Sequence, residues 1–479
     1  MITGGRGSRL VSSGLRMGIE LLPVQEQEQS GFGFAAARGS FMNSILSKRQ
    51  RHSIRTSRVA LLSAVLLLPV LSARGQDGAP TQTKLQLPPG TGQKIMERDC
   101  NICHDVNVMV AGAQWDPNDW AGLVNRMVEF GAPLNKEEIR IVADYLTTNF
   151  TGKGKPAGVV VPGVVEATIK EWDLPTHASQ PHDPLYTRDG FLWYTGQFAN
   201  MLGRFDPKTQ QFKEFNLKHP HSGPHGLVED KQGNILFTAQ QGGYIGKLDP
   251  KTGDVTEYPL PVSGLQMHSL AITQKGMIFF TVLEARAPWR LDGSKIGRLN
   301  PQTGEIKLVN TPTPNSGPYG IVVNSKGIPF FTERGSPRLG SVNPETMKIT
   351  EYVLPDPKVG TRRLAVTPDD VVWYTDSVQG HLGRFDPRTG DFKEWPSPSG
   401  PKSFPYGINT VGNVIWYAES NSSPNMIVRF DPETEKFQTW PIQAGGGIKH
   451  ISPQPDGNLW VTRPGSSGIA YIQLKKEKQ

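Results

Sequence analysis

The stretch Cys100-Asn101-Ile102-Cys103-His104 contains the only two cysteines of the 479-residue sequence. Two cysteines separated by two residues lie on one helical turn, so both thiols can add to the two vinyl groups of a porphyrin. The histidine that follows is placed to give its imidazole nitrogen to the iron from the proximal side. C-x-x-C-H is the attachment signature of c-type haem, and it predicts one covalent haem c on Cys100 and Cys103, with His104 as iron ligand.

Three other interpretations of this motif are weaker. A structural zinc site would need two more ligands nearby, and residues 76–150 contain no further cysteine and no histidine besides His104. A thioredoxin-like redox pair expects a strand-to-helix junction, whereas the flanking sequence predicts helices. A disulfide between Cys100 and Cys103 would close a strained, tiny loop and leave the histidine without a role.

Short helices must position the motif. Residues 91–100 predict a short helix that follows Pro88, Pro89 and Gly90. Asn135 and Glu138 predict a capping box, followed by apolar residues at helical spacing. We therefore expect a small all-α domain over residues 76–151, in which a final helix crosses the helix that bears the motif.

The run from Trp120 to Met127, the segment 131–134 and the pair Tyr145-Leu146 resemble the short cytochrome c domains of periplasmic oxidoreductases. This resemblance implies that Met127 is the distal ligand of the haem iron. Met109, only five residues past His104, is the alternative, and Met96 is expected to fill the core. A cytochrome c domain also implies a redox partner protein.

Residues 1–75 predict a leader rather than a folded part. Basic residues between positions 48 and 58 precede an apolar run over 59–71 and small residues at 72–75, which is the pattern of a secretory signal peptide. The apolar run is too short for a permanent membrane helix, although an uncleaved anchor is the alternative. Met42 lies at a suitable distance before the basic region, and we expect it to be the true start. We therefore expect a periplasmic or otherwise exported protein, in agreement with c-type haem.

The net charge of +7 comes from this leader. Ten of the 51 lysines and arginines and three of the 44 acidic residues lie before Gln76, so the remaining chain has equal numbers of both. Binding to nucleic acid requires a basic face, and the sequence therefore does not predict it.

After a flexible linker predicted over 152–163, the chain repeats a unit of four short strands. An Asp-Pro or Asn-Pro step recurs at intervals of 43 to 51 residues, at Asp206, Asp249, Asn300, Asn343, Asp386 and Asp431. Four strands at this period predict a blade of a β-propeller. A seventh unit from Lys449 lacks its outer strand, and the segment 169–175 matches that strand. The sequence thus predicts an all-β seven-bladed propeller over 164–474, closed by its first strand, and a short tail over 475–479.

The repeats, especially Trp193-Tyr-Thr, Ile296-Gly-Arg and Asp386-Pro-Arg-Thr-Gly, resemble the virginiamycin B lyase (streptogramin lyase) family. The resemblance implies a magnesium-dependent elimination with a histidine base and glutamates for the metal. In that family a glutamate stands two residues before the histidine position and another fourteen residues after it. Here those places hold no acid: they are Gln180, Gly223 and Gln266, and Gly196, Ala239 and Val282.

Alignment of the units on the threonine that ends the second strand exposes one ionisable or polar position, thirteen residues earlier. Equivalent positions of a propeller form a ring, and the first strands line the central channel. We name these residues the channel ring: His182, His225, His268, Tyr319, Arg362, Tyr406 and Lys449, with a one-residue deletion in the sixth unit. Three histidines from neighbouring blades predict a substrate site or a site for a divalent metal.

A second ring directly follows the same threonine and holds Glu333, Asp376 and Glu419 in blades 4 to 6. We expect these acids to face the histidines across a funnel. The favoured function is an electron-transferring haem protein whose propeller binds an unknown small molecule or partner. The alternative is a lyase or hydrolase in the funnel, with an accessory cytochrome; pure scaffolding would make both rings structural.

Overall fold

The structure is a computed structural model, and it describes residues 87–101, 106, 117–129, 132–150, 155–285, 294–442 and 447–475. The predicted leader, the start at Met42 and the residues Cys103, His104 and Met109 lie outside these ranges. No described helix is both long enough and apolar enough to cross a bilayer.

The described residues between Leu87 and Phe150 are mainly helical. Its elements are α1 (Thr91–Ile95), the π-helical turn η1 (Met96–Cys100), α3 (Pro117–Glu129) and α4 (Lys136–Phe150). The predicted capping box begins α4, since Asn135 Oδ1 accepts from the backbone N–H of Glu138 at 3.0 Å and Glu138 Oε2 accepts from that of Asn135 at 3.0 Å. Helices α1 and α4 cross closely, because a Cβ at Gly92 would lie 2.3 Å from Tyr145 Cβ.

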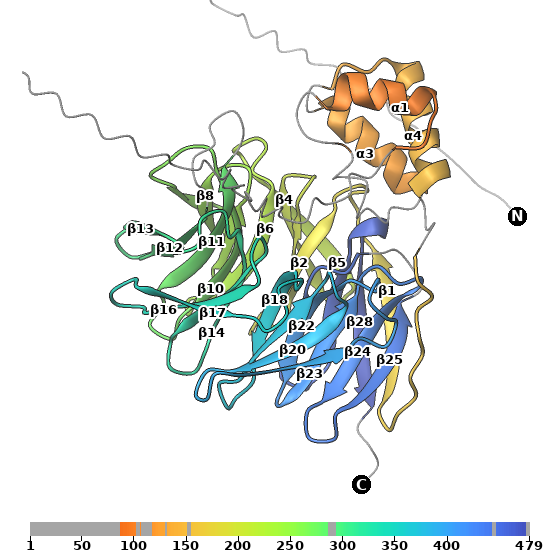
Figure 1. The fold of residues 1–479 in the computed structure, drawn as a ribbon. Coiled ribbons are helices and arrows are strands. Elements are labelled where there is room, and N and C mark those ends of the chain that lie inside the picture. The colour runs from red at the N-terminus through yellow and green to blue at the C-terminus, as the bar shows by residue number, and fades with distance from the viewer. Residues whose placement is uncertain are drawn as a thin grey trace, which may run out of the picture. The chain divides into compact units, whose positions relative to one another are not determined.

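The rest of the described chain forms seven antiparallel four-stranded sheets, which confirms the predicted propeller (Figure 1). Blade 1 is β2 (Pro181–Tyr186), β3 (Leu192–Gly196), β4 (Met201–Asp206) and β5 (Gln211–Asn216); blade 2 is β6 (Pro224–Glu229), β7 (Ile235–Ala239), β8 (Tyr244–Leu248) and β9 (Val255–Pro259); blade 3 is β10 (Leu265–Ile272), β11 (Ile278–Ala285), β12 (Lys295–Leu299) and β13 (Ile306–Asn310). Blade 4 is β14 (Pro318–Val323), β15 (Pro329–Glu333), β16 (Arg338–Val342) and β17 (Ile349–Val353); blade 5 is β18 (Thr361–Val366), β19 (Val372–Asp376), β20 (His381–Asp386) and β21 (Asp391–Pro396); blade 6 is β22 (Pro405–Val411), β23 (Val414–Glu419), β24 (Asn425–Asp431) and β25 (Lys436–Ile442).

Blade 7 combines both ends of the propeller sequence. Its strands β26 (Ile451–Pro453), β27 (Leu459–Arg463) and β28 (Gly468–Lys475) are completed by β1 (Glu166–Asp173), which pairs with β28 along its whole length. The buried Arg463 adds a side-chain link, since its Nη2 donates to the carbonyl of Trp172 and to Asp173 Oδ1, both at 3.0 Å. The first strands of successive blades contact one another around the ring, including β26 against β2. The predicted closure by the first strand is confirmed.

The residues that recur in the repeats have local structural roles. The Asp or Asn of each Asp/Asn-Pro step caps the turn after the third strand, as when Asp206 Oδ1 accepts from the N–H of Lys208 at 2.8 Å. Glycine recurs in the third strand because an aromatic ring of the second strand covers it. A Cβ at Gly383 would lie 2.1 Å from Tyr374 Cζ.

The segment predicted as a flexible linker is bound to blade 6 over its described part. The N–H of Val159 donates to Ser399 Oγ at 2.9 Å, and that of Val161 donates to Thr439 Oγ1 at 2.7 Å. The glycines of this segment suggested flexibility, but Gly158 and Gly163 instead allow its backbone to approach blade 6 closely. A Cβ at either position would lie within 2.6 Å of blade 6 atoms. The prediction of flexibility was wrong for residues 155–163.

Threonine hydroxyls join neighbouring blades at the channel. In six blades the threonine that ends the second strand donates to the carbonyl of the next blade's channel-ring residue at 2.6–3.1 Å; these threonines are Thr195, Thr238, Thr281, Thr332, Thr375 and Thr462. In blades 1 to 5 the same oxygen accepts a backbone N–H of its own blade at 2.9–3.2 Å. In blades 1 to 5 the hydroxyl thus links two first strands.

We predict that Thr332→Val destabilises the propeller by about 1–3 kcal/mol, because the valine leaves the carbonyl of Arg362 and the N–H of Gly320 without this partner. Thermal unfolding of the purified protein measures the change. Thr350→Val is the matched control, since Thr350 is exposed on the outer strand β17. Equal melting temperatures for the two variants would contradict the role assigned to the hydroxyl.

Candidate functional site

A β-bulge in the first strand aims the channel-ring residues at the axis. In blade 1, Pro181 pairs with Gly196 and Pro184 pairs with Tyr194, so His182 and Asp183 together oppose the single residue Thr195. The register shifts at the equivalent place in blades 2 to 6. Such a bulge turns two consecutive side chains away from the regular alternation.

The structure brings the channel ring together. The imidazole centroids of His182 and His225 lie 3.8 Å apart, those of His225 and His268 lie 4.0 Å apart, and the Tyr319 ring is 3.6 Å from that of His268. Tyr319 and Tyr406 meet through their hydroxyls. Arg362 lies 5.4 Å from the Tyr319 centroid and Lys449 lies 4.7 Å from that of Tyr406.

The predicted open funnel is filled by side chains at this level. The three histidines and two tyrosines of the ring are each at most 6% exposed. Arg362 and Lys449 are half-buried. Substrate access at the ring is therefore limited to its cationic side.

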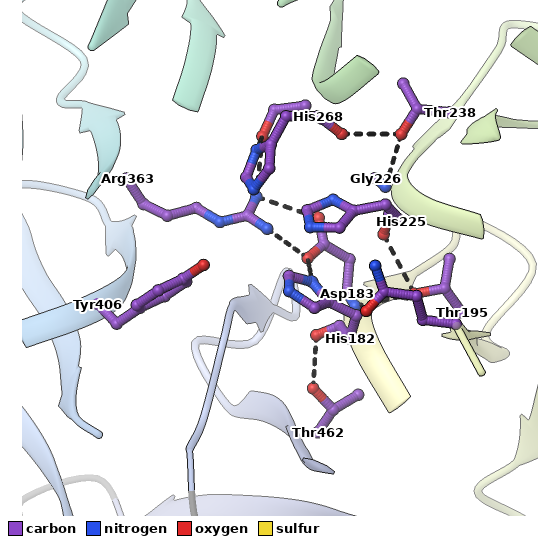
Figure 2. Close-up of polar contacts among 12 residues, drawn as sticks. His182, Asp183, Thr195, His225, Gly226, Thr238, His268, Arg363, Tyr406 and Thr462 are labelled. Atoms are coloured by element: carbon purple, nitrogen blue, oxygen red, sulfur yellow. Dashed lines mark hydrogen bonds and ion pairs between the residues drawn. The ribbon is translucent and has the colours of Figure 1, made fainter. Parts of the chain in front are cut away.

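A second layer, one residue further along each first strand, was not predicted. It contains Asp183, Ser269, Arg363 and His450, with glycine in blades 2, 4 and 6. Arg363 crosses the axis and binds Asp183 with both terminal nitrogens, at 3.1 and 2.5 Å (Figure 2). Asp183 Oδ1 also lies 2.8 Å from His182 Nδ1. A cavity of about 40 Å³ is lined by these polar residues and by apolar residues of the first strands.

Burial keeps the histidines of the axis neutral near pH 7. It lowers the pKa of His182 to about 4, against the opposing effect of Asp183, and that of His450 to about 3. Burial and the neighbouring histidines and Arg363 hold the pKa values of His225 and His268 well below the usual range. Although burial alone would raise the pKa of Asp183, Arg363 and His182 hold it well below its usual range. Asp183–Arg363 is therefore an ionised pair among neutral imidazoles.

The acids of the second predicted ring do not face the histidines, and this expectation was wrong. Glu419 binds Ser397 and Ser399, and Glu333 accepts from Ser336 Oγ at 2.6 Å. Asp376 accepts from backbone N–H groups, including that of Gly360 at 2.9 Å. Glu333 and Asp376 directly follow the threonine, and Glu419 directly follows Ala418 at the same place, so on these regular strands each acid lies on the opposite face from its predecessor.

The donor set on the axis does not fit magnesium. Among the described residues, one group that could hold a metal comprises His182, Asp183 and His225, whose ligand atoms lie within 4.8 Å of one another. Its single carboxylate is bound by the Arg363 guanidinium, whereas magnesium requires several oxygen ligands. Gly196 occupies one of the positions where the family resemblance places a glutamate, and the space beside it is filled by Met201. A softer metal on the histidines stays a prediction.

Two of the predicted haem ligands can be placed. Cys100 and Met127 are both half-buried and pack against the same apolar core, which includes Ile95, Trp120 and Leu146. Met96 is buried in that core. The described part of this helical region thus brings the first cysteine and the predicted distal methionine to one apolar core.

Comparison with known proteins concerns the propeller. The sequence profile of the virginiamycin B lyase family matches residues 159–288 and 287–479. A streptogramin B lyase structure is 26% identical with a TM-score of 0.58, over 64% of this chain and 98% of that chain. Virginiamycin B lyase from Staphylococcus aureus, with selenomethionine, is 24% identical with a TM-score of 0.58, over 65% and 100%. Hydrazine synthase from Kuenenia stuttgartiensis shares the fold at 12% identity and a TM-score of 0.51, over 63% and 96%. Comparison with curated protein sequences gives no match.

Removal of the axial guanidinium should make stability depend on pH. In the wild type the depressed pKa of Asp183 means that the pair stabilises the fold above the usual aspartate pKa and is lost only in acid. In Arg363→Met, burial raises the Asp183 pKa, so the free energy of unfolding falls as pH rises above about 4. We expect a loss of roughly 3–5 kcal/mol at pH 8 and a smaller loss at pH 5.

Chemical denaturation at the two pH values measures this difference. Arg384→Met is the control in the same blade, because Arg384 is half-buried and its partner Asp386 is also bound by Arg388. An Arg363→Met variant whose loss of stability is the same at both pH values would show that Asp183 is not a buried carboxylate dependent on Arg363.

Proposed function

This chain belongs to the virginiamycin B lyase family, and we propose that it joins a propeller of that family, here a binding domain for a small molecule, to an exported c-type haem domain that transfers electrons. The only two cysteines of the chain stand in the haem-attachment spacing with His104. The observation that supports the proposal best is the packing of Cys100 and Met127 against one core of short helices.

Each proposed ligand has a defined part. Cys100 and Cys103 hold the porphyrin covalently, His104 is the proximal ligand, and Met127 is the distal ligand, with Met109 as the alternative. When bound, haem supplies one-electron chemistry that the propeller side chains lack. Helices α1 and α4 cross at Gly92, and this close packing fixes the turn that bears Cys100. A redox partner protein would accept or supply the electrons outside the cytoplasm.

The alternative of an elimination in the channel has less support. It requires carboxylates for magnesium, and the places that the family resemblance assigns to them hold Gln180, Gly223 and Gln266, with Gly196, Ala239 and Val282 after the ring. Burial and the neighbouring charges hold the pKa values of His225 and His268 well below the usual range, which disfavours the protonated imidazole that a histidine base would form. Binding is therefore the function we assign to the propeller.

The haem assignment is tested by removing the thiols. The double variant Cys100→Ala and Cys103→Ala, exported with the haem-attachment machinery, should lose covalent haem, because no thioether can form. Pyridine haemochrome spectra after acid-acetone extraction measure what stays attached. Met96→Leu is the control within the same core and should keep its haem. Covalent haem in the double variant would refute the assignment.

The distal ligand is tested separately. A methionine sulfur on ferric haem gives a weak charge-transfer band at the red edge of the spectrum and favours ferrous iron. Met127→His should abolish the band and lower the reduction potential, while Met109→Leu leaves both unchanged. The reverse pattern would assign the distal position to Met109.

A further inference from the structure

One side of the channel ring gathers cations on aromatic rings. The Arg362 guanidinium lies 5.4 Å from the centroid of Tyr319, 5.1 Å from that of Phe404 and 5.9 Å from that of Tyr406. Lys449 Nζ lies 4.7 Å from the Tyr406 centroid, and the exposed Arg334 lies 5.8 Å from that of Tyr319. A guanidinium stacked on a ring keeps its N–H edge available for a planar anion.

These cations lack a carboxylate partner. Among the described residues, no salt bridge includes Arg334, Arg362 or Lys449; the Nε of Arg362 donates to Ser377 Oγ at 3.0 Å, and its two terminal nitrogens make no hydrogen bond. Asp376 attracts Arg362 from beyond ion-pair distance and is itself bound by backbone N–H groups. Glu333 and Glu419, the other acids of the second ring, are also turned to their own loops.

Burial makes the positive charges of Arg362 and Lys449 energetically unfavourable unless an anion binds to them. Arg362 and Lys449 are half-buried, and burial, followed by repulsion from Arg362 and Arg363, lowers the pKa of Lys449 to about 8. Charges withdrawn from water are normally paired or bound to a ligand. On the same axis, His225 Nδ1 is buried without a hydrogen-bond partner among the described residues, and its side chain is 2% exposed. The burial of Arg362 and Lys449 without an ion-pair partner among the described residues indicates a binding site on their side of the ring.

An aromatic platform lies beside the cations. Phe404 is half-buried at the ring and stacks with Tyr406 at a centroid distance of 5.8 Å and an interplanar angle of 24°. An inorganic oxyanion would use the cations and leave this apolar surface uncovered. A carboxylate attached to an aromatic ring would use both.

We propose that Arg334, Arg362 and Lys449, with Phe404 and the Tyr319–Tyr406 pair, form a binding site for a small aromatic carboxylate. The carboxylate lies between Arg362 and Lys449, and the aromatic ring packs on Phe404. The proposal deepens the function proposed above, because it assigns a ligand class to the propeller. It requires no metal and no reaction at the haem.

Calorimetric titration of the full-length purified protein with benzoate tests the site. Benzoate should bind, and benzyl alcohol, which lacks the charge, should not. Arg362→Gln and Lys449→Met should each weaken benzoate binding at least tenfold, because each removes one of the two partners of the carboxylate. Lys275→Gln, an exposed lysine paired with Glu345 in another part of the propeller, should leave it unchanged. Thermal melting of each variant checks that it folds, and Lys449→Arg, which keeps the charge, should retain binding.

Three outcomes would overturn the proposal: no benzoate binding, equal binding of benzyl alcohol, or unaltered affinity in both folded charge variants. A titration with sulfate separates the two ligand classes. If sulfate binds more tightly than benzoate, and if Phe404→Ala changes the affinity for neither anion, the site is assigned to inorganic oxyanions and the aromatic part of the proposed ligand is refuted. Haem content measured on the same samples distinguishes the two proposals. Benzoate binding by a protein without haem leaves the site valid and refutes the haem function; haem without benzoate binding refutes only the site.

Discussion

The two hydrogen bonds made by the threonine hydroxyl at the end of the second strand in blades 1 to 5 determine the geometry of the axis. The oxygen accepts a backbone N–H of its own first strand and donates to the backbone carbonyl of the next blade's ring residue. Blade 6 has Ala418 at this place, and there Ser420 Oγ donates to the carbonyl of Ile448 at 2.6 Å. Because these bonds involve only main-chain atoms of the first strands, the ring is held in place whatever side chains it bears.

Because the backbone of the ring is held independently of its side chains, the two sides of the axis can carry different chemical groups. Three imidazoles contact one another on one side, and burial keeps them neutral. Arginine, lysine and tyrosine occupy the other side. The Arg363–Asp183 pair spans the layer beside the ring, and its two charges offset each other's burial. Since none of the described carboxylates forms an ion pair with the cations of the ring, their side of the axis has a positive field.

The sequence predicted the architecture well because the propeller is built from a strong repeat. The Asx turn after each third strand and the glycine under each aromatic ring recur at fixed offsets, so the period, the number of blades and the closing strand follow from them. The convergence of the channel ring follows from the same alignment. The haem motif is an equally strong signal, but Cys103, His104 and Met109 lie outside the described residues, and the haem remains a prediction.

The two errors at the axis have different physical causes. On a regular strand consecutive residues point to opposite faces, and this rule holds for Thr332 and Glu333, so the acids turn away from the histidines. At the bulge the rule fails, and both His182 and Asp183 reach the axis. The layer with Asp183 and Arg363 could have been found by reading the aligned position one residue further. The side chains of these two layers therefore determine the chemistry of this axis, while the threonine bonds that hold the layers in place use only backbone atoms of the first strands.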